Sequence, residues 1–148
     1  MERVNKHMRE ILFRGQTRKC GEKVRMGDGE KLPGHWTYGG IFRGAGDYSV
    51  IYGWEDGDEH TGATIKKLAV YSDTVGQYTG LKDKNGKRIF EGDIIEHKRI
   101  GKRFSVRFDN DSARFILDGT PCNYDFTELT DLQLCVIGNI YDTPELLE

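Results

Sequence analysis

Two short basic clusters are the residues in this sequence with the clearest chemical potential. The first is on one predicted hairpin and the second in one short loop: Lys84, Lys87 and Arg88, then Lys98, Arg99, Lys102 and Arg103. Ammonium and guanidinium groups at this density are typical of surfaces that follow the phosphates of nucleic acid. A solvated hairpin tip produces the same pattern, because charged side chains favour exposed positions. These seven residues are therefore candidate contacts for a protein partner or for nucleic acid.

The other reactive residue types form no recognisable catalytic or metal site. Nucleophilic catalysis needs a base beside a serine or cysteine, together with an orienting acid, and no such arrangement is visible. The histidines lack the close spacing by which metal ligands converge: His7, His35, His60 and His97. Gly44-Ala45-Gly46 lacks the lysine and the following helix of a phosphate-binding loop. We therefore expect a protein that is not an enzyme and that uses no metal or cofactor.

The first basic cluster lies on a predicted β-hairpin. Residues 77–81 alternate in the manner of a short strand, and Asn85-Gly86 is a dipeptide typical of tight reversals. A second strand follows at 88–90, and Gly92 indicates a corner or bulge before a third strand at 94–95. Short strands in such close succession favour a small, strongly bent barrel over a flat sandwich.

The second basic cluster precedes the clearest strand pattern in the chain. Phe104, Val106 and Phe108 alternate with polar residues, and a turn at 109–112 leads to a returning strand at 113–117. A last apolar strand is predicted at 134–137. Thr143 before Pro144 predicts a short helical turn, with the threonine as its cap and the proline at its first position.

The first half of the chain also favours strands. Residues 9–14 alternate in a way that predicts a strand buried on both faces, while 35–42 and 48–54 are aromatic-rich and predict strands that pair. Residues 63–71 fit either a short helix or a strand. Residues 1–7 show no apolar periodicity, and we interpret them as an N-terminal extension.

Three segments of the chain resemble the YopX protein family, whose members are encoded mainly by phages and prophages. The stretch from Val75 to Ile95 resembles the family signature, and Met8 to Gly15 resembles the family's usual start. Ile137 to Tyr141, followed by Pro144 to Leu147, is similar to the way in which the family ends. The resemblance implies a phage or prophage origin and supports the small barrel, and it implies no particular activity.

The net charge of −2 hides a strong segregation of charge along the chain. Consecutive segments 1–31, 32–81, 82–107 and 108–148 carry net charges of +4, −3, +5 and −8. A chain polarised in this way attracts its own other half, a second copy or a charged partner. It can also present a basic face to nucleic acid.

Cysteine usage and hydropathy indicate the compartment. Cys20, Cys122 and Cys135 are odd in number and widely spaced, and no secretory leader is visible, which favours free thiols in a reducing compartment. No apolar run approaches the ~20 residues that span a bilayer. We therefore expect a cytoplasmic protein of the bacterial host that does not enter the membrane.

Together these patterns predict an all-β protein. Its parts are an extension at 1–7, a β-rich region at 8–74 and an SH3-like barrel at 75–148 that carries the signature. For function we favour a non-enzymatic module that acts through protein contacts, including self-assembly into a homo-oligomer. The alternative is a nucleic-acid-binding protein that uses the basic hairpin edge formed by the seven residues named above.

Overall fold

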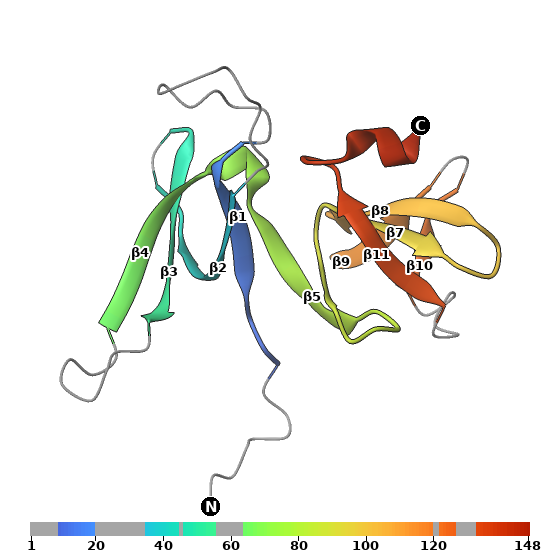
Figure 1. Ribbon diagram of the computed structural model, residues 1–148, viewed down its shortest axis with the longest axis horizontal. Helices are drawn as coiled ribbons and strands as arrows, with labels where there is room; N and C mark the ends of the chain where they lie inside the picture. The colour runs from blue at the N-terminus through green and yellow to red at the C-terminus, as the bar shows by residue number, and fades with distance from the viewer. Residues whose placement is uncertain (1–8, 20–34, 45, 56–63, 120–121, 127–132) are drawn as a thin grey trace, which may run out of the picture.

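The computed structural model describes residues 9–19, 35–44, 46–55, 64–119, 122–126 and 133–148. These residues form mainly β-strands, arranged in two antiparallel sheets (Figure 1). The all-β fold class predicted from the sequence is therefore confirmed. The expected extension at 1–7 and Cys20 lie outside the described residues.

The first sheet has six strands in the order β4-β3-β2-β1-β5-β6. Its strands are β1 (Phe13–Arg18), β2 (His35–Phe42), β3 (Tyr48–Glu55), β4 (Thr64–Tyr71), β5 (Gly76–Lys82) and β6 (Arg88–Phe90). β2 pairs with β3, as the two aromatic-rich patterns predicted. The segment that fitted either a helix or a strand is β4, which pairs with β3 along its whole length.

β1 begins later than the sequence predicted. The alternation at 9–14 indicated a strand buried on both faces, whereas the strand starts at Phe13 and Ile11 is exposed. Gly15 lies in the middle of β1, where a Cβ atom would be 2.8 Å from Cγ2 of Val70 in β4. Only a residue without a side chain permits this close approach. The sheet therefore curls, so that β1 approaches β4 although the two strands are not hydrogen-bonded neighbours.

The second sheet has five strands in the order β10-β9-β8-β7-β11. Its strands are β7 (Asp93–His97), β8 (Lys102–Asp109), β9 (Arg114–Asp118), β10 (Tyr124–Asp125) and β11 (Leu134–Asn139). The predicted hairpin of β8 and β9 forms, with Phe104 and Val106 buried on one side of β8. These two residues pack with Ile95, Leu117 and Leu134 in the main hydrophobic core.

The β5–β6 hairpin, which carries the predicted signature, joins the two sheets (Figure 1). β5 pairs with both β6 and β1, whereas Ile89 of β6 belongs to the core of the second sheet. Gly86 adopts a φ of +81° in the predicted Asn-Gly turn, and Gly92 a φ of +90° at the predicted corner. The domain boundary expected at residue 75 stays a prediction. The hairpin that follows it pairs within the first sheet and packs into the core of the second, and a sheet is not by itself a folding unit.

The loop between β5 and β6 folds around the buried carboxylate of Asp83. Its Oδ1 accepts the N–H groups of Asn85 and Lys87, both at 2.9 Å, and its Oδ2 accepts the N–H of Val136 in β11 at 3.0 Å. The loop thus covers an edge of β11. The SH3-like barrel stays a prediction, since the described strand order from β10 to β11 is open.

The described 3-10 turns are η1 (Ser72–Thr74) and η3 (Pro144–Leu147). The turn predicted after Thr143 is therefore present, but the predicted cap is wrong, because Thr143 makes no side-chain cap hydrogen bond. Its Oγ1 instead donates to the Asn139 carbonyl at 3.2 Å and accepts the Asn139 N–H at 3.1 Å. The end of β11 thus competes successfully for the hydroxyl group.

Candidate functional site

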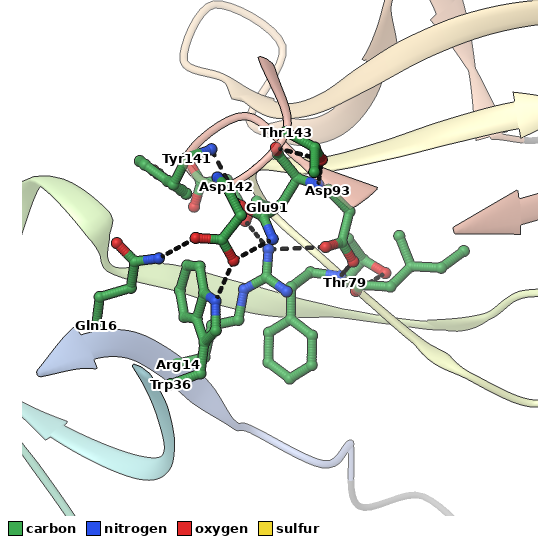
Figure 2. A network of polar contacts seen from close by, with 12 residues as sticks. Arg14, Gln16, Trp36, Thr79, Glu91, Asp93, Tyr141, Asp142 and Thr143 are labelled. Atoms are coloured by element: carbon green, nitrogen blue, oxygen red, sulfur yellow. Dashed lines mark hydrogen bonds and ion pairs between the residues drawn. The ribbon is translucent and has the colours of Figure 1, made fainter. Parts of the chain in front are cut away.

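A buried ion pair joins the two sheets (Figure 2). Nη2 of Arg14 in β1 lies 2.7 Å from Oδ1 of Asp93 in β7, and the two side chains are 7% and 2% exposed. The other Asp93 oxygen accepts the N–H of Phe90 at 2.8 Å. Burial raises the pKa of Asp93 above its ordinary value, because desolvation outweighs the attraction of the guanidinium.

Aromatic rings enclose the Arg14 guanidinium. Its Cζ lies 4.5 Å from the centroid of the Trp36 ring and 4.9 Å from that of Phe90, distances typical of cation–π contacts. Trp36 packs edge-on against Tyr141, with 5.7 Å between the ring centroids. Nε of Arg14 is buried and has no hydrogen-bond partner among the described residues. Arg14 is therefore held mainly by the two rings and by Asp93.

A second carboxylate, that of Asp142, extends this network (Figure 2). Its Oδ1 accepts a hydrogen bond from Nε2 of Gln16 at 2.7 Å. Its Oδ2 accepts hydrogen bonds from the Trp36 indole N–H at 2.8 Å and from Nδ2 of Asn139 at 3.0 Å. Nothing in the residue spacing indicated this network, because Gln16 and Asp142 lie 126 positions apart. Asp93 and Gln16 leave almost no surface for a substrate, so the network holds the sheets together.

The first predicted basic cluster divides between two sides of the β5–β6 hairpin. Lys87 and Arg88 line a groove that faces Tyr38 of β2, whereas the backbone N–H of Lys84 donates to the Leu134 carbonyl of β11 at 3.0 Å. Nη2 of Arg88 lies 2.9 Å from a carboxylate oxygen of Glu10. Lys84, Lys87 and Arg88 are all exposed, so their charges reach the surface.

The second predicted basic cluster is partly neutralised by Glu96. Nζ of Lys98 and Nε of Arg103 lie 2.7 Å and 3.0 Å from its carboxylate oxygens. The hydrogen bonds from Lys98 and Arg103 lower the pKa of Glu96, and the bond to Glu96 raises the pKa of Lys98. Arg99 and Lys102 are exposed. The field that a phosphate would meet at this loop is therefore weaker than the sequence suggests.

The two basic clusters approach each other at the start of β11. Lys84 donates its backbone N–H to the Leu134 carbonyl, and Lys98 donates its backbone N–H to the Gln133 carbonyl at 2.9 Å. The structure thus brings Lys84 and Lys98 to neighbouring residues of one strand end. Lys87 and Arg88 belong instead to the groove beside β2.

This groove, of about 410 Å³, lies between β2 and the β5–β6 hairpin. The exposed ring of Tyr38 and the buried ring of Phe90 meet in it edge to face, with 5.5 Å between centroids. Its cationic lining residues are Arg14, Lys82, Lys87 and Arg88. Sequence reasoning missed Tyr38, Arg14 and Lys82, because they converge only through the strand order β2-β1-β5-β6.

Exposed aromatic and apolar side chains gather on one face of β2, β3 and β4, which we call the outer face. It is defined by Phe42, Tyr48, Tyr52 and Ile65, which are 68%, 52%, 46% and 58% exposed. Tyr52 is paired directly with Gly40 in β2 and with Lys67 in β4, so these residues share the face. Ile51 and Val70 point to the opposite, buried side.

Other candidate features of the described residues are few. They include no group of three or more histidine, cysteine, aspartate or glutamate side chains that could hold a metal ion. Cys122 and Cys135 are free thiols, the first exposed and the second buried. No helix within the described ranges has the length and apolar character needed to cross a membrane.

Comparison with known proteins gives a family match over more than half of the chain. The family model described as YopX protein matches residues 45–148. The chain is also similar to the crystal structure of protein EF1440 from Enterococcus faecalis, with 26% sequence identity and a TM-score of 0.43. That match covers 68% of this chain and 78% of the other. No curated protein matches.

Proposed function

Since the chain belongs to the YopX protein family, we propose that it is a phage or prophage protein of the host cytoplasm that acts as a non-enzymatic protein-interaction module. Its binding surface is the outer face of β2, β3 and β4, and its partner is a second copy of the same chain. The observation that carries the proposal is the set of large exposed side chains on this face: Phe42, Tyr48, Tyr52 and Ile65.

The composition of the outer face supports a protein contact. Contiguous exposed apolar side chains mark interaction sites, and interface cores are rich in aromatic residues and poor in acids. No acidic residue lies on the outer face within the described parts of β2, β3 and β4. In the monomer this apolar surface is hydrated, which is unfavourable. Association removes the surface from water and is therefore favoured.

A second copy fits this surface because the face supplies both members of a favourable contact. Lys67 lies directly opposite Tyr52 on neighbouring strands, so a two-fold axis can place the ammonium group of one copy over an aromatic ring of the other. Like charges then need not meet. Rings on the two copies can also pack edge to face, which adds to the area that they bury.

The oligomeric state tests this proposal. Sedimentation velocity and light scattering from about 10 µM to about 1 mM are expected to show a dimer, a range that spans weak interfaces. The double substitution Phe42→Ser with Tyr52→Ser should weaken the dimer at least about ten-fold, because truncated aromatic anchors commonly cost more than ~1 kcal/mol each.

The matched control is Ile100→Ser, which removes an exposed apolar side chain from the turn after β7. This variant should dimerise as the unaltered protein does. A strict monomer at the highest concentration would contradict the proposal. So would a control variant that dissociates as readily as the double variant.

A further inference from the structure

We propose that the groove between β2 and the β5–β6 hairpin binds a nucleotide unit, either free or within a single strand of nucleic acid. In this site the base stacks on the ring of Tyr38, and the phosphate lies among Lys82, Lys87 and Arg88. The site lies beside the outer face and does not depend on the proposed dimer.

Tyr38 provides the stacking surface. Its side chain is 51% exposed, and it meets Phe90 at an interplanar angle of 61° with 5.5 Å between centroids. The buried Phe90 ring therefore fixes one edge of Tyr38 and leaves half of its surface free. Every base has a flat π-face, so a single fixed and exposed ring accepts a base of any identity.

The cations in the groove are side chains rather than backbone groups. Lys82 and Lys87 are exposed, and the described lining of the groove includes no acidic residue. The backbone N–H groups of Gly86 and Lys87 are already used, since both donate to Asp83. The ammonium groups of Lys82 and Lys87 are thus left to bind a phosphate, and the Arg88 guanidinium, which pairs with Glu10, has further donors to share with it. Side-chain cations of this kind are typical of sequence-independent nucleic-acid contacts.

Arg14 forms part of the buried floor of the groove. It lines the groove, it is 5% exposed, and its Nε has no hydrogen-bond partner among the described residues. Buried donors without an acceptor are uncommon in folded proteins. This donor lies beneath the Trp36 and Phe90 rings and has almost no accessible surface, so Arg14 contributes a buried positive charge below the groove and no direct contact to a ligand.

The combination of groups favours a nucleotide over an acidic peptide. Aspartate and glutamate side chains would satisfy the lysines but carry no ring to place against Tyr38. A nucleotide has a planar base and a phosphate a few bonds apart. The groove volume of about 410 Å³ lies within the ~300–1,000 Å³ range of small-ligand sites.

Titration calorimetry with defined probes tests the site. The probes are a fifteen-residue oligothymidylate, adenosine monophosphate, adenosine and inorganic phosphate, at about 50 mM salt, where phosphate contacts are strong. Lys87→Glu should weaken binding of the oligonucleotide or the monophosphate at least about ten-fold, because it reverses a charge at the phosphate. The matched control is Lys102→Glu on β8, which should bind as the unaltered protein does.

A second pair of variants tests the stacking. Tyr38→Ala should weaken binding about ten-fold, whereas Tyr38→Phe keeps the ring and should retain it. Binding of the monophosphate assigns the groove to a free nucleotide, and binding of the oligonucleotide alone assigns it to a strand. Both results support the proposal.

Several results would overturn the groove site. These are no binding of either nucleotide probe, tighter binding of inorganic phosphate than of the monophosphate, equal binding of an oligoglutamate peptide, and equal losses in Lys87→Glu and Lys102→Glu. The outer-face variant with Phe42→Ser and Tyr52→Ser should bind nucleotide normally. Loss of the dimer and loss of nucleotide binding are therefore separate results.

Discussion

At the scale of single residues, Arg14 has the most demanding environment in the described chain. It is buried, it pairs with Asp93, and two aromatic rings enclose its guanidinium. Such a pair contributes little net stability when intact, because desolvation offsets the attraction between the charges. Removal of only one partner is costly, because the other charge then stays buried without a counter-charge.

We therefore predict that Arg14→Met lowers the free energy of unfolding by about 3–5 kcal/mol, since it strands a buried carboxylate. The double substitution Arg14→Met with Asp93→Asn should recover part of this loss. The asparagine is neutral, and its Oδ1 can still accept the Phe90 N–H that now binds Asp93. Urea unfolding at neutral pH measures both variants, and a double variant no more stable than Arg14→Met would contradict the account.

The Arg14–Asp93 pair also determines the direction in which stability changes with pH. The pKa of Asp93 is raised by burial, so the folded state holds this proton more tightly than the unfolded state does. The stability that protonated Asp93 adds is complete below pH 3.8, the ordinary pKa of an aspartate, and it is lost as the pH rises through the raised pKa of the folded state. The stability of the unaltered protein relative to the double variant should fall across this window. A difference that does not change with pH would be the contrary result.

At the scale of elements, the β5–β6 hairpin depends on one side chain. Asp83 accepts two N–H groups from its own loop and one from β11. These contacts define the shape of the tip that carries Lys84 and Lys87. The loop and the edge of β11 are therefore stabilised together.

We predict that Asp83→Ala destabilises the protein by about 3 kcal/mol, since three N–H groups lose a charged acceptor. The control is Asp111→Ala, which removes an exposed aspartate from the turn between β8 and β9 and should change stability by less than ~0.5 kcal/mol. Thermal and chemical unfolding compare the two. Equal stability of the two variants would contradict a structural role for Asp83.

Elements with local determinants were predictable from the sequence, and features set by distant contacts were not. The β8–β9 hairpin and the turn at Gly86 follow from alternation and turn chemistry within a few residues. The continuation of β1 beyond residue 14 was not predictable, because the need for a glycine at position 15 arises only from the close approach of Val70 in β4. The groove was also missed, since Tyr38 and Lys82 meet through strand order.

At the scale of the whole molecule, the two sheets share more than a chain connection. Side chains of the first sheet, those of Arg14, Gln16 and Trp36, bond to Asp93 and Asp142. The β5–β6 hairpin of the first sheet also contributes Ile89 to the core of the second. Contacts of this kind couple the stabilities of the parts that they join. The protein should therefore unfold as one body.

The expected result is one transition, with tryptophan fluorescence and far-UV circular dichroism giving the same midpoint. Asp142→Ala removes the acceptor of the Trp36 and Gln16 side chains and should separate the two signals. Glu145→Ala, at the exposed start of η3, is the control and should leave them coincident. Two transitions in the unaltered protein would show that the sheets are independent.

The position of Asp83 has a consequence for communication within the molecule. Lys87 lines the groove with its side chain, while its backbone N–H and that of Val136 in β11 bind the same carboxylate. A bound phosphate that ordered Lys87 would restrict the motion of the loop. Through the loop it would also restrict the Asp83 carboxylate and the Val136 amide that this carboxylate binds. Occupancy of the groove would then be recorded as slower hydrogen exchange at the edge of the second sheet, at an amide that does not itself line the groove.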